Sequence, residues 1–121
     1  RTIALEKYAL NTLEYYFDDR CAVIELPASV LSEVGAQQGD IEGISAMPRT
    51  IEGVDVGITL RQNSLDSIKI SVRTSEDADA CKIAQGLGGG GHVRAAACTM
   101  SADSMATAAE IIRKDIENTL L

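Results

Sequence analysis

The chain has 121 residues, enough for one domain with a modest hydrophobic core. Apolar residues make up 45% and charged residues 24%, a composition typical of soluble globular proteins, and the 3% of aromatic residues predicts an aliphatic core. The formal net charge of −7 disfavours a protein that binds nucleic acid through a broad basic surface. Any phosphate site is therefore expected to be a local pocket.

The cysteine and histidine content disfavours a metal centre or a disulfide framework. Cys21, Cys81 and Cys98 form no CxxC pair and are odd in number, so we interpret them as reduced cysteines of a cytoplasmic protein. The chain has a single histidine, so we expect no metal site in it. No apolar run approaches the roughly 20 residues that span a bilayer, and no signal peptide is visible.

The first part of the chain predicts helices around one strand. Residues 2–17 place apolar side chains on one helical stripe, and residues 21–26 form an apolar run typical of a strand. Residues 27–35 begin with a proline and end with a glycine, which suits a helix. A further short helix is expected over residues 41–46, with Asp40 as its N-cap.

The clearest strand signal is a pair of alternating segments. Residues 54–61 and residues 68–73 each alternate apolar with polar side chains and are joined by a short connection. This pattern predicts an antiparallel hairpin. Lys69, Ser71 and Arg73 then share its outward face, because side chains two positions apart lie on one face of a strand.

The last part of the chain predicts two helices separated by small residues. Residues 75–87 have helical spacing, with Ser75 as the expected N-cap. A run of small residues follows at 95–98, and Ser101 is expected to cap a final helix that reaches residue 120. Together the elements predict a single α/β domain with a central mixed β-sheet flanked by helices.

Four consecutive glycines, Gly88, Gly89, Gly90 and Gly91, stand between the predicted helix and the run of small residues. Glycines cost conformational entropy on folding, so a chain that keeps four needs either flexibility or close backbone approach. Successive glycine N–H groups can form a nest that binds an anion. The alternative is a tight turn without a ligand.

Two side chains are candidates for binding a phosphate beside the glycines. His92 follows them directly, where an imidazole can donate to a phosphate oxygen; the alternative is a structural histidine. Arg73 ends the second strand of the hairpin and could bind phosphate with two hydrogen bonds or stack on a base. The alternative for Arg73 is a solvated surface charge. We interpret Arg49, Arg61 and Arg94 as surface charges.

Residues 88–97, with the sequence GGGGHVRAAA, resemble the GGGHxxAAG signature of the DHH-associated domain, family 1, of DHH phosphoesterases. Residues 68–74 resemble the K-x-S-x-R-S strand of that family, and the resemblance extends over roughly residues 39–100. The last glycine of the signature is replaced here by Ala97. Among such proteins, the sequence looks most like bacterial short-oligoribonuclease and pAp-phosphatase enzymes and exopolyphosphatase-related proteins.

The resemblance implies a substrate-binding role. In such enzymes an N-terminal DHH domain holds two manganese ions, and the C-terminal domain closes over a nucleotide or short single-stranded oligonucleotide. Carried over by motif, Arg73 and His92 would hold the nucleotide, residues 88–91 would supply the nest, and Ser71 is a secondary candidate. Manganese is expected in the N-terminal domain, which would also be this domain's partner, and no membrane partner is expected.

The resemblance also implies a division of the chain. Residues 1–20 are expected to be the remnant of an interdomain helix, and residues 21–121 the DHH-associated substrate-binding domain. The chain lacks the DHH motif and begins with Arg1, so we expect no catalytic residue and no hydrolysis by this fragment alone. One alternative is an RNA-binding or dimerising module like the C-terminal domain of alanyl-tRNA synthetases. A purely structural or homodimerising domain is the other.

Overall fold

The structure, a computed structural model, describes residues 2–64, 67–101 and 104–120. The α-helices are α1 (Thr2–Thr12), α2 (Ala28–Val34), α3 (Gln38–Ala46), α4 (Ala80–Gly86) and α5 (Met105–Leu120), with a 3-10 turn η1 (Pro48–Thr50). The strands are β1 (Glu14–Tyr16), β2 (Cys21–Leu26), β3 (Val56–Ser64), β4 (Ser67–Thr74), β5 (Gly90–Gly91) and β6 (Ala95–Ser101).

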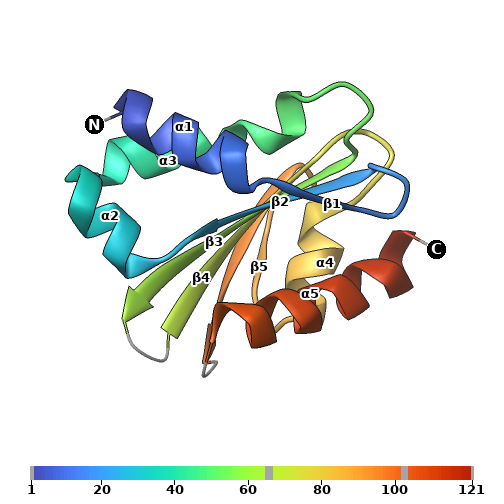
Figure 1. Cartoon of the computed structure of the whole chain (residues 1–121). Helices are drawn as coiled ribbons and strands as arrows, with labels where there is room; N and C mark the ends of the chain where they lie inside the picture. The colour runs from blue at the N-terminus through green and yellow to red at the C-terminus, as the bar shows by residue number, and fades with distance from the viewer. Residues whose placement is uncertain (1, 65–66, 102–103, 121) are drawn as a thin grey trace.

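In the described part of the chain, the strands form one six-stranded sheet in the order β1-β2-β3-β4-β6-β5 (Figure 1). Strands β2 and β3 are parallel, whereas the other neighbours are antiparallel, so the sheet is mixed. The predicted fold class is therefore confirmed. The predicted strand over residues 21–26 and the predicted hairpin of β3 and β4 are confirmed with it.

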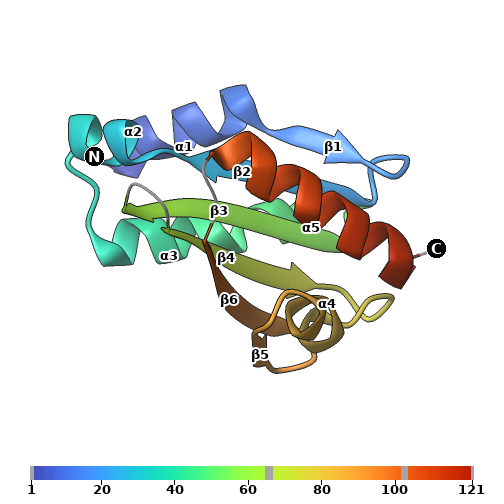
Figure 2. The same ribbon diagram turned by 90° about the horizontal axis from the view of Figure 1, so that it is seen from below.

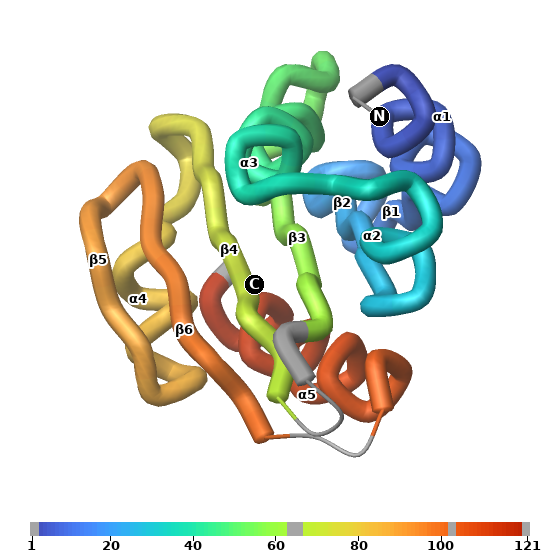
Figure 3. Tube along the Cα trace, turned by 90° about the vertical axis from the view of Figure 1, so that its left-hand side faces the viewer, coloured from blue at the N-terminus to red at the C-terminus, as the bar shows by residue number. Residues whose placement is uncertain are grey.

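The two faces of the sheet are covered by different helices. Helices α4 and α5 lie on one face, where they enclose the larger aliphatic cluster (Figure 2). Helices α1 and α3 lie on the opposite face, where Leu5, Ile24 and Ile44 belong to a second buried cluster. Figure 3 shows α3 and α5 on opposite sides of the strands. Burial of apolar surface on both faces, at about 25 cal/mol per Å², holds the layers together.

The helix predicted over residues 2–17 is wrong at its C-terminal end. Helix α1 ends at Thr12, and the next residues form the edge strand β1, which pairs antiparallel with β2. The chain reverses between these strands at Phe17, Asp18 and Asp19, which have φ angles of 57°, 54° and 65°. Left-handed conformations are uncommon for residues other than glycine, so this turn has no simple sequence signal. The predicted division of the chain at residue 20 stays a prediction.

The expected N-cap Ser75 does not begin helix α4. The helix begins four residues later, where the Asp79 carboxylate accepts a hydrogen bond from the backbone N–H of Lys82 at 3.1 Å. The Ser75 hydroxyl instead donates to the Asp55 carboxylate at 2.8 Å. The Ser75 side chain, which the local sequence predicts to be a helix cap, therefore forms a tertiary hydrogen bond with Asp55 instead.

Two further caps differ from those predicted. Ser101 is the last residue of β6, and the Ser104 hydroxyl accepts the backbone N–H of Thr107 at 3.1 Å before helix α5. Helix α3 starts earlier than predicted, with Gln37 as its N-cap and Asp40 as the third helical residue of a capping box. Both predicted helices exist, but each boundary is displaced by a few residues.

Candidate binding pocket

Strand β4 directs its apolar and polar side chains to opposite faces of the sheet. Ile68, Ile70 and Val72 are buried in the cluster beneath α4 and α5, while the residues between them are only partly buried. Lys69, Ser71 and Arg73 therefore lie on the face that carries α3, as the alternation predicts. The register places Ala97 of β6 opposite Ser71 and Ala95 opposite Arg73.

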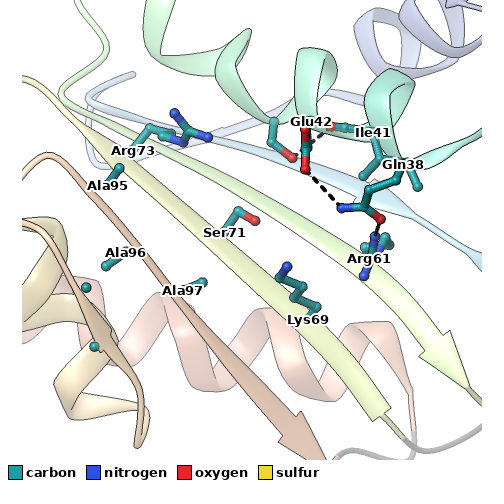
Figure 4. Close-up of a pocket in the computed structure, with 13 residues that line it drawn as sticks. Gln38, Ile41, Glu42, Arg61, Lys69, Ser71, Arg73, Ala95, Ala96 and Ala97 are labelled. Carbon is teal, nitrogen blue, oxygen red and sulfur yellow. Dashed lines mark hydrogen bonds between the residues drawn. The ribbon is translucent and has the colours of Figure 1, made fainter.

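An open pocket of about 420 Å³ lies over this face, between α3 and the outer strands (Figure 4). Helix α3 forms one wall with side chains at positions 38, 41, 42 and 45, which share one helical face. The lining residues are Gln38, Ile41, Glu42, Ser45, Arg61, Lys69, Ser71, Arg73, Gly90, Gly91, Ala95, Ala96 and Ala97. The small alanine side chains of β6 leave the floor of the pocket open.

The pocket is cationic although the whole chain is acidic. Three of its side chains, Arg61, Lys69 and Arg73, carry positive charge, and Glu42 carries the opposing negative charge. No residue in the described ranges forms an ion pair or hydrogen bond with the Lys69 ammonium or the Arg73 guanidinium. A local excess of positive charge with unused donors favours an anionic ligand.

The glycine run is explained partly by packing against β6. A Cβ added at Gly89 would overlap the Cys98 side chain, and one at Gly91 would lie 2.6 Å from the β6 backbone. Gly88 has a φ of 88°, which favours glycine. Gly90 differs, because an added Cβ would meet no atom within 4 Å. Close packing accounts for Gly89 and Gly91, the backbone conformation accounts for Gly88, and Gly90 has its open side at the pocket.

The predicted site residues fall into two groups. Ser71, Arg73, Gly90 and Gly91 line the pocket together. The backbone N–H groups of Gly88 and Gly89 donate to carbonyl groups of α4 at 3.1 and 2.8 Å, and neither residue is in the pocket lining. A phosphate nest that uses all four glycines stays a prediction.

His92 is exposed and does not line the pocket. Its backbone N–H donates to the Ala95 carbonyl at 2.8 Å, which closes the tight connection from β5 to β6. The imidazole is not buried among apolar side chains, so it is accessible to a ligand. The predicted role of His92 as a phosphate ligand stays a prediction.

Sequence reasoning missed the contribution of α3 and β3 to the pocket. Arg61, interpreted from sequence as a surface charge, lies opposite Lys69 in the β3–β4 register and lines the pocket. Its Nη1 donates to the Gln38 Oε1 at 2.6 Å, and the Gln38 Nε2 donates to Glu42 at 3.4 Å. The hairpin register could have predicted the Arg61–Lys69 pair, whereas the position of α3 is a tertiary feature.

The fold and the pocket define an α/β domain with a cationic cavity on the open half of one sheet face. Residues 20–118 match the model of the DHHA1 domain. The chain therefore belongs to the DHHA1 domain family. This agrees with the resemblance carried by the glycine–histidine segment.

Known proteins support the same assignment. The chain is 33% identical over 91 residues to the bifunctional oligoribonuclease and PAP phosphatase NrnA of Thermus thermophilus, covering 75% of this chain and 26% of that protein. It is 26% identical to an exopolyphosphatase-related protein from Bacteroides fragilis, with a TM-score of 0.86 and coverage of 97% of this chain and 34% of the other. The chain thus spans about a quarter to a third of these relatives.

A third similarity concerns the fold alone. The C-Ala domain of Aquifex aeolicus alanyl-tRNA synthetase is 15% identical, with a TM-score of 0.60 and coverage of 86% of this chain and 96% of that domain.

No helix in the described ranges is long and apolar enough to cross a membrane. Among those residues, no three His, Cys, Asp or Glu side chains gather as metal ligands. The described residues therefore do not fit the manganese centre that the family implies, and we assign no step to it.

Proposed function

We propose that this chain binds the phosphate end of a nucleotide or short single-stranded oligonucleotide, as the substrate-binding domain of a manganese-dependent DHH-family phosphoesterase. The observation that carries the proposal is Arg73, which lines a cationic pocket together with Ser71, Gly90 and Gly91 (Figure 4). A guanidinium can give two parallel hydrogen bonds to a phosphate. The family membership and the NrnA relative support the substrate class.

The role of the pocket is positioning. Arg73 would hold the phosphate, and the small side chains of β6 would leave room for the sugar and base. In this proposal the manganese ions and the attacking water belong to another domain, so this chain contributes by fixing the ester in one orientation. Its isolated affinity is expected to be weak, because only one side of the substrate is contacted.

Isothermal titration calorimetry with pAp tests the proposal at low ionic strength. Arg73→Gln should weaken binding about tenfold, because a charge-assisted hydrogen bond of about 1.5 kcal/mol is lost. Lys114→Gln is the matched control, since it removes one positive charge from the exposed surface of α5, away from the pocket. Equal losses in the two variants would mean that only general charge matters and would contradict the proposal.

An RNA-binding module is the alternative function, and a tRNA gel shift separates the two. Proteins that contact many phosphates lose affinity steeply as salt rises. The acidic chain offers one small cationic pocket, so weak and nearly salt-independent retardation of tRNA is expected. Tight binding with a steep salt dependence would favour the alternative.

A further inference from the structure

The connection from β5 to β6 is exposed to solvent, but protein hydrogen bonds hold its main chain. The side chains of His92, Val93 and Arg94 are all exposed. The Val93 carbonyl nevertheless accepts the backbone N–H of Ala80 at 2.8 Å and the hydroxyl of Thr74 at 3.0 Å. The Arg94 Nη1 donates to the same oxygen at 3.3 Å. A surface loop can leave such a carbonyl to water, so donors from separate elements hold this one unusually firmly.

Arg94 joins this carbonyl to the segment before α4. Its Nη1 also donates to the Ala78 carbonyl at 2.7 Å, so one guanidinium nitrogen bridges the carbonyl groups of Ala78 and Val93. The Arg94 carbonyl in turn accepts the backbone N–H of Thr74 at 3.1 Å. The sequence interpretation of Arg94 as a surface charge agrees with its exposure but does not account for these bonds. We call the side chains of Thr74 and Arg94, together with the Val93 carbonyl, the clamp.

His92 lies between two fixed points of the main chain. Its own N–H donates to the Ala95 carbonyl at 2.8 Å, and the clamp holds the carbonyl of the residue that follows it. Each residue has only two soft backbone torsions. Hydrogen bonds on both sides therefore fix the direction in which the side chain of His92 leaves the backbone, although that side chain is exposed.

The clamp also connects His92 to the strand that carries Arg73. Thr74 follows Arg73 at the end of β4, and Arg73 pairs with Ala95 of β6, beside which it lies in Figure 4. Ala95 is the residue whose carbonyl accepts the His92 N–H. Arg73 lines the pocket, and so does Gly91, which directly precedes His92. Short hydrogen-bonded links therefore relate the position of His92 to that of Arg73.

We propose that Thr74 and Arg94 are positioning residues, which hold His92 in place relative to Arg73 so that the imidazole and the guanidinium meet the ligand together. This inference rests on the proposed function and on the predicted contact between His92 and the ligand. A loop that is already ordered loses less conformational entropy when the ligand binds. In this account neither Thr74 nor Arg94 contacts the ligand itself.

The test is a double-mutant cycle with His92, measured by titration calorimetry with pAp. Thr74 is 2% exposed, and Thr74→Val removes its hydroxyl while keeping its shape, so pAp binding should weaken about threefold. Thr74→Ser keeps the hydroxyl and should restore nearly native affinity. In a His92→Gln background, Thr74→Val should have no further effect, because the residue that it positions is gone. Equal weakening in both backgrounds would mean that Thr74 acts through the fold and would overturn the inference.

Arg94 provides an independent arm of the test, because its side chain is exposed and its replacement leaves the core intact. Arg94→Gln should weaken pAp binding about threefold in the native chain and leave it unchanged in the His92→Gln background. Lys82→Gln is the matched control, since it removes an exposed positive charge from α4 outside the pocket lining. Equal weakening by Lys82→Gln and Arg94→Gln would assign the loss to general charge and contradict the inference. This arm decides the matter if Thr74→Val does not fold.

The failures of the two proposals are distinguishable. His92 is the single histidine of the chain, so its imidazole C–H signals in proton NMR report it directly, and saturating pAp should shift them. Unshifted imidazole signals, or native affinity of His92→Gln, would overturn the inference and leave the proposed role of Arg73 standing. A native chain that does not bind pAp overturns both proposals. Thermal melting of each variant verifies that the native fold persists, so that weaker binding reports positioning and not unfolding.

Discussion

The carboxyl group of Asp115 lies against Gly86 at the end of α4, and one of its oxygens has no hydrogen-bond partner among the described residues. This oxygen, Oδ2, is buried, and burial raises the pKa of the carboxyl above the ordinary 3.8. A Cβ added at Gly86 would overlap this carboxylate, so the glycine at the end of α4 makes room for it. Burial, followed by the charge of Asp115, also raises the pKa of Cys98 on β6. At neutral pH the ionised carboxyl of Asp115 therefore lowers the stability of the fold.

Asp115→Asn should make the protein more stable at pH 7 than the native chain. A raised pKa means that the folded state favours the protonated carboxyl of Asp115. The stability that this protonated form contributes is fully present below pH 3.8 and is lost as pH rises through the folded pKa. The asparagine stays neutral and avoids that loss. Thermal melts at pH 3.5 and pH 7 test this. A variant advantage at pH 3.5 that vanishes at pH 7 would contradict the account.

Asp55 has the opposite pH behaviour. Hydrogen bonds from Arg20 and Ser75, both at 2.8 Å, hold the pKa of Asp55 below its ordinary 3.8 despite partial desolvation. The stability from this group is present above pH 3.8 and is lost as pH falls through the folded pKa. Asp55→Asn should therefore destabilise the chain at pH 7 by about 1 kcal/mol, a value reduced by solvent screening. Urea unfolding at pH 7 and pH 2.5 should show that the difference shrinks in acid.

At the element scale, the glycine segment combines packing with pocket formation. Gly89 packs against Cys98, whereas Gly90 has open space on its side-chain face and lies opposite Ala97 in the β5–β6 pairing. Residues opposite each other in a strand pair share a face, so a methyl group at Gly90 would lie on the pocket side. The two neighbouring glycines therefore allow stability and binding to be separated.

Gly89→Ala should destabilise the chain by about 1–3 kcal/mol, because the added methyl group overlaps β6 and the neighbouring backbone must shift. Gly90→Ala should leave the melting temperature nearly unchanged and weaken pAp binding. Thermal melts together with calorimetric titrations measure both effects. If Gly89→Ala melts like the native chain, or if Gly90→Ala binds pAp with native affinity, the assignment of these glycines is wrong.

Elements with a strong periodic pattern could be predicted from sequence, and elements decided by tertiary contacts could not. The alternation in β3 and β4 reports burial on one face directly, so the hairpin and the shared face of Lys69, Ser71 and Arg73 followed from it. Strand β1 was missed because its few residues continue the helical pattern of α1. The Ser75 cap failed because Asp55, distant in sequence, accepts its hydroxyl.

The pocket was only half predictable. Ser71, Arg73 and the glycine segment stood out locally, through strand alternation and through an unusual run of one residue type. The wall formed by α3 depends on how that helix packs across β3 and β4, which no local pattern encodes. Ala97 lies on the pocket floor, in the place of the signature glycine, and β6 accommodates its methyl group.

At the scale of the whole molecule, α4 and α5 pack on one face of the sheet, whereas the other face leaves a pocket beside α3. Cys21 belongs to the core beneath α4 and α5 and is 1% exposed, and burial raises its pKa to about 12. A thiol reacts as its thiolate, so Cys21 should resist iodoacetamide at pH 8 in the folded protein and react only after unfolding. Mass spectrometry of the labelled peptides tests this. Rapid labelling of Cys21 in native buffer would mean that the core opens or is packed differently.

The pocket beside α3 makes the central claim testable in a single measurement. Titration of the isotope-labelled chain with pAp, followed by backbone amide NMR, should perturb the signals of Ser71, Arg73, Gly90 and Gly91 most strongly, while signals of α5 on the opposite face stay in place. That pattern would locate an anionic ester in the cationic pocket. Saturable shifts confined to α5, or no shifts at millimolar pAp, would contradict the account.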